Sequence, residues 1–341
     1  MKNSLKLLLS AAFAAAALPS LAMADAKSIY GDDNRLDYFE ASAPMQRLAD
    51  SVVSLWPNNQ VRARGEQTDL ATIGFGDALN LCPGEKFREQ PIGAFCSGTL
   101  VGPDLVLTAG HCITDEAKCA DTKFVFGFNI DGAGRAAKTT VPSSDVYGCK
   151  KIVGRDLDKE YGGYLGMAVN IAKYILNLAG PDYAVVQLDR PVTGRQPLPI
   201  NRRGGLSEGD PVFVIGHPVG LPVKVAGDAK VRYIGLKAFF TTDLDTFGGN
   251  SGSAVFNART NQIEGILVRG STDFGDTPAG CKTQVRYTQD EGRGEAVTKI
   301  SKVKRLIPAL SGTKAADEAP EAADPVPTGV PSEELVRRVG F

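Results

Sequence analysis

Histidine is nearly absent from this sequence, because His111 and His217 are the only two among 341 residues. A zinc site built from several imidazoles is therefore not expected, and a reaction that needs a histidine has two candidates. The sequence also lacks an excess of either charge, with 38 Lys and Arg against 39 Asp and Glu. Such a balance gives no reason to expect nucleic acid or an anionic membrane as a partner.

Long apolar runs are missing after the first residues, so no membrane span is expected. The start itself is typical of a secretory signal peptide. Lys2 and Lys6 begin an apolar run over 7–21, and Ala22-Met-Ala24 is a small-x-small cleavage site. We therefore expect a signal peptide at 1–24, a mature chain from residue 25 with a net charge of about −3, and a periplasmic or secreted location.

The six cysteines fit an oxidising compartment. Cys96 and Cys112 flank the segment that carries His111, and a bridge between them would clamp that loop. The other four cysteines allow three pairings. Cys119 and Cys149 flank an expected hairpin and are the favoured second pair, which leaves Cys82 and Cys281 either bridged or free.

From about residue 45 to 310 the sequence favours strands. Short apolar or alternating runs recur between Gly, Pro and Asp turns, at 51–55, 94–101, 105–109, 124–128, 183–188, 211–215, 230–235 and 263–268. Many short strands with few helical periods predict an all-β barrel or sandwich.

Two stretches instead have apolar residues at helical spacing. The first, within 164–179, predicts a helix inserted before Asp182. The second predicts a closing C-terminal helix through Val297, Ile300, Val303, Ile307 and Leu310. Beyond 310, Ala, Pro, Asp and Glu dominate without an apolar period, so 311–341 is expected to be a flexible tail.

Three segments carry residues typical of nucleophilic catalysis. Ser251 lies in Asp245-Thr-Phe-Gly-Gly-Asn-Ser-Gly-Ser-Ala254, His111 follows Leu-Thr-Ala-Gly, and Asp182 begins an apolar run. A serine hydroxyl needs a neutral imidazole to accept its proton, and that imidazole needs a carboxylate to hold its tautomer. The N–H groups of Gly249 and Ser251 are the expected oxyanion donors. His217, between Gly and Pro, is interpreted as a turn histidine.

The chain order His, Asp, Ser and the segment Gly-Gly-Asn-Ser-Gly-Ser at 248–253 resemble the chymotrypsin-like serine proteases. Ile29-Tyr-Gly-Asp-Asp-Asn-Arg35 is similar to the start of the bacterial trypsin-like and glutamyl-endopeptidase branch. The resemblance covers roughly 29–309. It implies a secreted serine endopeptidase that works through an acyl-enzyme, with His111, Asp182 and Ser251 as the triad.

The resemblance also implies the architecture. It predicts two six-stranded antiparallel β-barrels of chymotrypsin type within 45–310, one over about 45–190 and one over about 191–310. An N-terminal segment at 25–44 would precede them, and the active site would lie in the cleft between the barrels.

The chain departs from the digestive enzymes near the nucleophile. Asn250 replaces the aspartate that pairs with a newly cut amino terminus, and Phe247 replaces a cysteine that braces the specificity pocket. Asp245 lies six residues before Ser251, the spacing of an acidic pocket base, which weakly favours cleavage after Arg or Lys. Arg269, on the opposite wall, is the second predicted substrate-binding residue. It would pair with Asp245 or favour acidic substrates instead.

Other functions remain open at this point. An HtrA-like quality-control protease would carry a PDZ module, for which the tail is too short. A catalytically inactive protease fold that acts as a binding module is the alternative outside enzymes. No cofactor and no metal site is expected, although loop carboxylates such as Asp243 and Asp245 leave calcium open. Protein or peptide substrates are the expected partners, and the sequence is compatible with a monomer.

Overall fold

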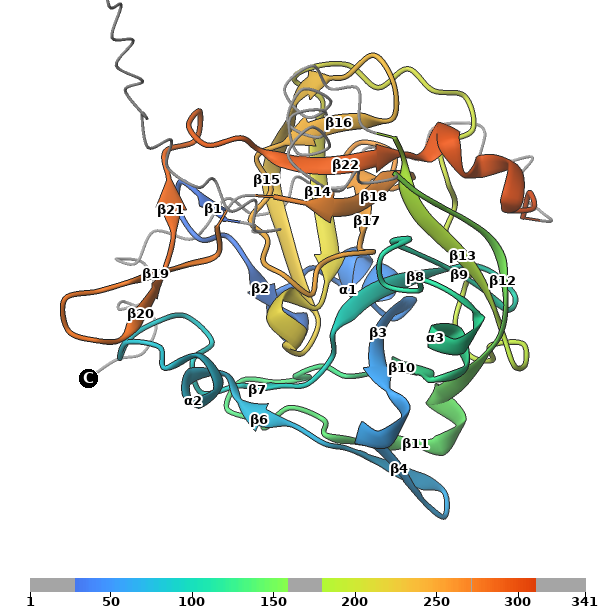
Figure 1. The fold of residues 1–341 in the computed structure, drawn as a ribbon, viewed down its shortest axis with the longest axis horizontal. Coiled ribbons are helices and arrows are strands. Elements are labelled where there is room, and N and C mark those ends of the chain that lie inside the picture. Colours follow the sequence, from blue (N-terminus) through green and yellow to red (C-terminus); the bar gives the residue numbers. More distant parts are fainter. Residues whose placement is uncertain (1–27, 159–179, 271, 311–341) are drawn as a thin grey trace, which may run out of the picture.

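The computed structural model describes residues 28–158, 180–270 and 272–310. The predicted signal peptide, the inserted helix at 164–179 and the C-terminal tail lie outside the described residues. The described chain folds into two closed six-stranded antiparallel barrels, with few helices (Figure 1). The all-β architecture predicted from the sequence is therefore confirmed.

The first barrel has the strand order β10-β12-β13-β9-β8-β3. Its strands are β3 (Val52–Pro57), β8 (Cys96–Gly102), β9 (Leu105–Thr108), β10 (Thr122–Phe126), β12 (Val146–Leu157) and β13 (Asp182–Leu188). The long strand β12 shifts register twice against β13, and such bulges supply the bending that closure requires.

The second barrel has the order β14-β17-β18-β22-β16-β15 and is closed by the pairing of β14 with β15. Its strands are β14 (Pro211–Gly216), β15 (Lys224–Ile234), β16 (Phe239–Thr242), β17 (Ala254–Asn257), β18 (Ile263–Arg269) and β22 (Glu295–Lys299). The short strand β2 (Leu36–Asp37) pairs with the start of β15, so the N-terminal segment attaches to this barrel.

Smaller elements surround the barrels. They are the strands β1 (Ile29–Tyr30), β4 (Val61–Arg64), β5 (Gln67–Leu70), β6 (Ile73–Gly74), β7 (Pro91–Ile92), β11 (Thr140–Pro142), β19 (Phe274–Asp276), β20 (Lys282–Gln284) and β21 (Arg286–Tyr287), and the helices α1 (Ala43–Ala49), α2 (Phe75–Leu79) and α3 (Glu116–Ala120). Among them, β1 pairs with β21 in parallel. This pairing brings the first described residues beside a segment more than 250 positions later in the chain.

Strand β14 shows why some runs are continuously apolar. Val212 and Val214 belong to the core of the second barrel, whereas Phe213 and Ile215 belong to the cluster that includes the core of the first. Successive side chains of a strand point to opposite faces. A strand buried on both faces therefore needs apolar residues at every position, and this one joins the two barrels.

The predicted C-terminal helix is different in the structure. Val297 belongs to strand β22, and the residues that follow form two short 3₁₀ turns at Ile300–Lys302 and Lys304–Leu306. Val297, Ile300, Val303 and Ile307 are all buried. The apolar spacing was therefore a correct signal of burial, but two tight turns satisfy it as well as one α-helix.

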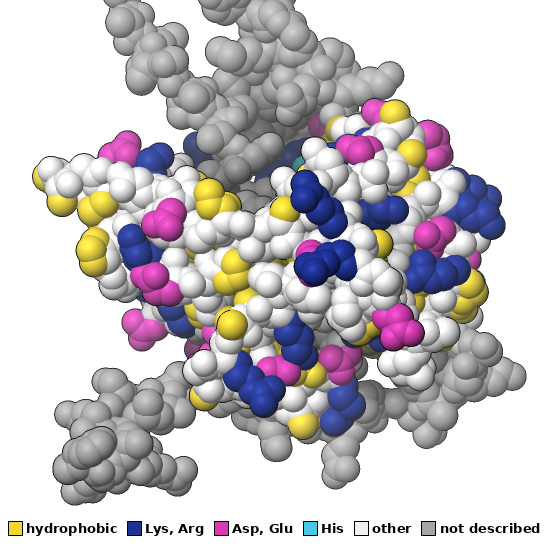
Figure 2. Space-filling model, turned by 90° about the horizontal axis from the view of Figure 1, so that it is seen from below, with side chains coloured by type: hydrophobic (Ala, Val, Ile, Leu, Met, Phe, Trp, Pro, Cys, Tyr) yellow, Lys and Arg dark blue, Asp and Glu magenta, His cyan; other side chains and the backbone are white. Residues whose placement is uncertain are grey.

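The described surface is mixed in charge. Figure 2 shows Lys and Arg side chains interspersed with Asp and Glu on the face seen there. None of the helices in the described ranges is long and apolar enough to cross a membrane.

All six cysteines are paired. The bridges join Cys96 to Cys112, Cys119 to Cys149 and Cys82 to Cys281. The first two are the pairs that the sequence favours. The third, which the sequence left open, connects the segment after α2 to the hairpin of β19 and β20 across 199 positions.

His217 is buried at the start of a 3₁₀ turn after β14. Its ring stacks on Phe128, and its Nδ1 donates to the carbonyl oxygen of Leu221 at 2.9 Å. Its Nε2 is buried and has no hydrogen-bond partner among the described residues. Burial lowers the pKa of His217 to about 4, so the ring is neutral at physiological pH. A turn histidine with a packing role, as interpreted from its neighbours, fits these contacts.

Removing the long-range bridge should reduce stability. We expect the double variant Cys82→Ser, Cys281→Ser to lose about 2–4 kcal/mol of unfolding free energy, because cross-linking distant positions restricts the unfolded chain. Urea unfolding of both proteins measures the loss. Non-reducing peptide mapping of the wild type provides the check, and an alkylated Cys82 or Cys281 in the folded protein would contradict the pairing.

The neutral ring of His217 should make stability depend on pH. The unfolded chain takes up a proton near the ordinary histidine pKa of 6.5, whereas the folded chain does so only at about 4, so stability falls as pH falls through this window. The variant His217→Asn lacks this loss. The wild-type advantage in urea unfolding should therefore shrink by about 2 kcal/mol between about pH 7.5 and about pH 4.5. An advantage independent of pH would show that His217 titrates normally in the fold.

Candidate active site

His111 lies in the loop that follows β9. Its Nδ1 is 2.8 Å from Oδ2 of Asp182, and its side chain is 36% exposed. An ionised carboxylate can only accept a hydrogen bond, so in the neutral ring Nδ1 carries the proton and Nε2 keeps a free electron pair. The partner therefore selects the tautomer that can accept a proton at Nε2.

Asp182 is the buried centre of this arrangement. Its carboxylate is 1% exposed, and Oδ1 accepts hydrogen bonds from the backbone N–H groups of Gly110 at 2.6 Å and His111 at 3.2 Å. Glycine is the only residue type that fits at position 110. A Cβ at Gly110 would lie 2.4 Å from the carbonyl oxygen of Asp156. The glycine before the histidine thus lets the loop close onto the carboxylate.

The backbone of Asp182 is held by the second barrel. The hydroxyl of Thr298, on β22, accepts from the N–H of Asp182 at 3.2 Å and donates to its carbonyl oxygen at 2.9 Å. Arg155, on β12, donates from Nε to the carbonyl oxygen of Gly110 at 2.9 Å. Both contacts fix the loop from outside, and neither residue was singled out from the sequence.

Ser251 lies in the loop between β16 and β17, and it is 8% exposed. Gly249 and Gly252, on either side, have φ angles of 81° and 88°, which favour glycine. A Cβ at Gly252 would lie 2.1 Å from the carbonyl oxygen of Ser97, and one at Gly249 would lie 2.8 Å from that of His217. The backbone of this loop is therefore in close contact with both barrels.

Ser97, on β8, forms hydrogen bonds to this loop and to His217. Its N–H donates to the carbonyl oxygen of Ser251 at 2.9 Å, and its hydroxyl donates to that of Gly249 at 2.9 Å. The same hydroxyl accepts from the N–H of His217 at 2.9 Å. Asn250 is 3% exposed, and its Oδ1 lies 3.4 Å from the hydroxyl of Ser253. An uncharged side chain therefore occupies the position before Ser251.

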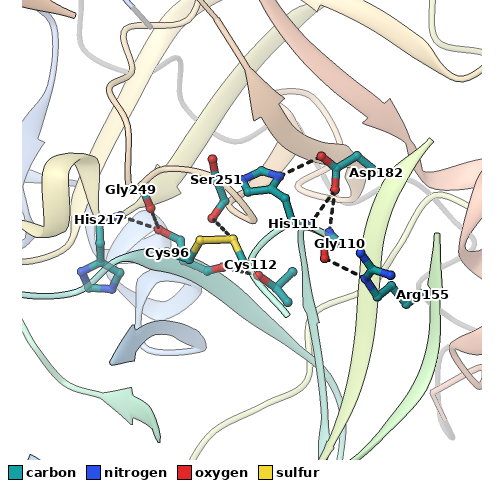
Figure 3. The surroundings of a disulfide bond; sticks show 11 residues. Cys96, Gly110, His111, Cys112, Arg155, Asp182, His217, Gly249 and Ser251 are labelled. Atoms are coloured by element: carbon teal, nitrogen blue, oxygen red, sulfur yellow. Dashed lines mark hydrogen bonds and ion pairs between the residues drawn. A yellow bond between two sulfur atoms is a disulfide. The ribbon is translucent and has the colours of Figure 1, made fainter. Parts of the chain in front are cut away.

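The bridge between Cys96 and Cys112 joins β8 to the loop that carries His111, and it lies next to the Ser251 loop. A ring nitrogen of His111 lies within 4.8 Å of both sulfur atoms, and Sγ of Cys112 is 3.7 Å from the carbonyl oxygen of Ser251. Figure 3 draws the His111 ring between Ser251 and Asp182. The structure thus gathers the three residues that the sequence identified from separate segments.

The two predicted pocket residues have different neighbours. Asp245 is 1% exposed, and its carboxylate accepts from the N–H of Tyr30 at 2.7 Å and that of Asn34 at 3.0 Å. Arg269, at the end of β18, places its guanidinium 5.4 Å from the ring centre of Phe239. No ion pair joins Arg269 to Asp245 within the described chain. The pairing of these two residues considered from the sequence is therefore not present.

Possible metal ligands are few. Among the described residues, one group of three, Cys96, His111 and Cys112, has its donor atoms within 4.8 Å of one another. Both sulfurs belong to the disulfide, so neither is a thiolate ligand. The loop carboxylate of Asp243 accepts from the N–H of Lys230 at 2.6 Å and from Nε2 of Gln289 at 2.8 Å. Protein donors therefore already bind the carboxylates of Asp243 and Asp245.

A separate cavity of about 400 Å³ lies away from these residues. Its walls come from 198–207, Asp210, the turn between β17 and β18, and the last described residues near Leu310. None of His111, Asp182 and Ser251 lines it. Its volume therefore says nothing about substrate binding at the candidate site.

Comparison with known proteins assigns the chain to a family. A sequence profile of the trypsin-like peptidase domain matches residues 96–266, about half of the chain. A comparison with curated protein sequences found no significant match.

Two solved structures illustrate the structural similarity. One is a Glu endopeptidase in complex with MPD, with 16% sequence identity and a TM-score of 0.43 over 85% of this chain and 100% of its own. The other is a serine endoprotease from Yersinia pestis, with 17% identity and a TM-score of 0.42 over 77% of this chain and 65% of its own. On the strength of the profile match and the barrel architecture, the chain belongs to the trypsin-like peptidase family and is a serine endopeptidase.

Proposed function

We propose that Ser251 is the nucleophile, His111 the general base and Asp182 the carboxylate that orients and stabilises the base. Ser251 Oγ attacks the carbonyl carbon of the scissile peptide bond, and Nε2 of His111 takes the hydroxyl proton. The resulting imidazolium gives that proton to the leaving amine, and an acyl-enzyme forms. A water molecule then attacks the acyl carbon in the same way and releases the second product.

The single observation that carries this proposal is the set of three N–H groups on one buried carboxylate. The bond from His111 Nδ1 to Asp182 at 2.8 Å fixes the ring tautomer. The bonds from the N–H groups of Gly110 and His111 fix the loop that carries the ring. A buried carboxylate with such donors is positioned to stabilise the positive ring that develops during attack.

The oxyanion hole is the second part of the proposal. The N–H groups of Gly249 and Ser251 would bind the oxygen that becomes negative when the carbonyl carbon turns tetrahedral. Support comes from the peptide units that carry these two donors. The carbonyl oxygen of Asn250 accepts from the N–H of Ser253 at 2.9 Å, and that of Gly248 accepts from a backbone N–H of the turn after β14. Such bonds hold the peptide groups in one orientation before the substrate arrives.

We also propose that the enzyme acts in the periplasm or outside the cell. Three disulfides, one of them across 199 positions, persist only in an oxidising compartment in most organisms. The leader predicted at 1–24 would direct the chain there.

The preference for basic residues requires Asp245 to face the substrate. Its carboxylate is buried and already accepts two backbone N–H groups, which argues against that role. Arg269 is partly exposed and has no ion pair within the described chain. We therefore propose Arg269 as the charged residue that contacts the substrate, with a preference for acidic side chains.

Loss of any triad member should nearly abolish turnover while the fold survives. We expect Ser251→Ala, His111→Ala and Asp182→Asn each to lower kcat on the order of 10⁴-fold or more, because the three residues act as a unit. Hydrolysis of a mixed peptide library by the purified proteins is the measurement. His217→Asn and Ser207→Ala are the matched histidine and serine controls and should stay within tenfold of the wild type. Wild-type turnover by Ser251→Ala would exclude the assignment.

Replacing Arg269 should change the choice of substrate and not the chemistry. We expect Arg269→Ala to lower kcat/KM for peptides with Glu or Asp before the cleaved bond by at least tenfold, because a charge-assisted hydrogen bond is lost. Cleavage profiles of the variant, the wild type and the exposed control Arg62→Ala provide the measurement. An unchanged profile would show that Arg269 does not contact the substrate.

A further inference from the structure

The first described residues pack directly against the loop that carries Ser251. Ser28, Ile29 and Tyr30 are almost completely buried. Residues 29 and 30 form β1, which pairs with β21, and the N–H of Thr246 donates to the carbonyl oxygen of Ser28 at 3.2 Å. We call residues 28–35 the N-terminal clasp.

Asp245 is the main attachment point of this clasp. Its two oxygens accept from Tyr30 and Asn34, so one carboxylate binds both ends of a five-residue turn. The side chain of Asn34 also donates to the carbonyl oxygen of Gly227 at 2.7 Å, on strand β15. Burial raises the pKa of Asp245 to about 7, and the two N–H groups oppose that rise. No lysine or arginine forms an ion pair with Asp245 in the described chain.

Arg35 forms the second attachment, at Phe247. Its guanidinium is fully buried and lies 4.1 Å from the centre of the Phe247 ring. Its Nε and Nη2 donate to the carboxylate of Asp33 at 2.9 Å and 2.6 Å. Nη2 also donates to the side-chain oxygen of Gln284 at 2.7 Å. A cation held over an aromatic ring in a desolvated site is a favourable contact.

These contacts reach the catalytic loop within a few residues. The carbonyl oxygen of Phe247 accepts from the N–H of Asn250 at 3.0 Å, and this bond closes a turn directly before Ser251. The N–H of Gly248 donates to Asp273 at 2.9 Å, and the hydroxyl of Ser28 donates to the carbonyl oxygen of Thr272 at 3.0 Å. The clasp therefore contacts residues 245–247 directly, a few positions before Ser251.

We propose that Asp245 is a positioning residue, which uses the N-terminal clasp to hold residues 245–250 and thereby aligns Ser251 and the N–H groups of the oxyanion hole. This proposal rests on the proposed function. The donors are amide N–H groups within the chain and a side-chain guanidinium, so the clasp needs no newly cut amino terminus. The uncharged Asn250 before the nucleophile is compatible with such a mechanism.

Two variants test the clasp from its two attachments. Asp245→Asn replaces one acceptor oxygen by an NH₂ group that opposes a backbone N–H, and Arg35→Met removes the cation but keeps the stem. Asp243→Asn is the matched control, because Asp243 is an equally buried carboxylate two residues away. Its partners are Lys230, Gln289 and Arg232 instead.

The main readout is the rate at which a small fluorophosphonate labels Ser251, because this reagent needs the nucleophile and oxyanion hole but not a side-chain pocket. We expect both clasp variants to label at least tenfold more slowly, with kcat lowered for substrates of every side-chain class and KM within twofold. The control should label within threefold of the wild type.

A second readout does not depend on activity. Hydrogen exchange of the peptide that covers 245–253, measured in the Ser251→Ala background, should be faster in both clasp variants and unchanged in Asp243→Asn. If Asp245→Asn does not fold, Arg35→Met carries the same two measurements.

Two results would overturn the proposal. Wild-type labelling by Asp245→Asn with a selective loss of cleavage after Arg and Lys would make Asp245 the pocket base. Equal losses in Asp243→Asn would show a general loss of stability. Failure of the proposed function is distinct from both, because the wild-type protein itself would then not be labelled.

Discussion

The site depends on satisfying one buried carboxylate at the boundary between two barrels. Asp182 begins a strand of the first barrel, while its backbone is bonded to Thr298 of the second. A buried carboxylate without hydrogen-bond donors would be strongly destabilising. The loop of Gly110 and His111 supplies those donors, so the orientation of the imidazole follows from the need to solvate Asp182. The fold and the proposed catalytic geometry are therefore fixed by the same bonds.

The second half of the site is fixed by close backbone packing. Gly249 and Gly252 leave no room for a side chain, and Ser97 bonds to the carbonyl groups on both sides of Asn250. The disulfide between Cys96 and Cys112 lies between this loop and the His111 loop. Small residues and one hydroxyl thus hold the Ser251 loop against the first barrel, and the disulfide fixes the His111 loop beside it.

Much of this arrangement could be predicted from the sequence, because its signals are local. Turn residues and short apolar runs located the strands, and the two glycine-rich segments located His111 and Ser251. Thr298 and Ser97 could not be found in this way. Their side chains act across 116 and 152 positions of the chain, and a threonine or serine in a strand is ordinary. The apolar spacing after Val297 predicted burial correctly, but it could not distinguish 3₁₀ turns from an α-helix.

The N-terminal segment accounts for the residues at positions 247 and 245, where the comparison with the digestive enzymes predicts a bracing cysteine and a pocket base. Phe247, which stands where a bracing cysteine is expected, provides the ring over which Arg35 lies. Asp245, at the spacing of a pocket base, binds Tyr30 and Asn34 instead. Spacing along the chain predicts where a residue lies in the loop. It does not determine which neighbouring donors form hydrogen bonds with its side chain. A carboxylate is bound by the nearest buried donors, and here a segment more than 200 positions earlier supplies them. A noncovalent brace from the N-terminal segment thus supports the loop at which the cysteine is missing.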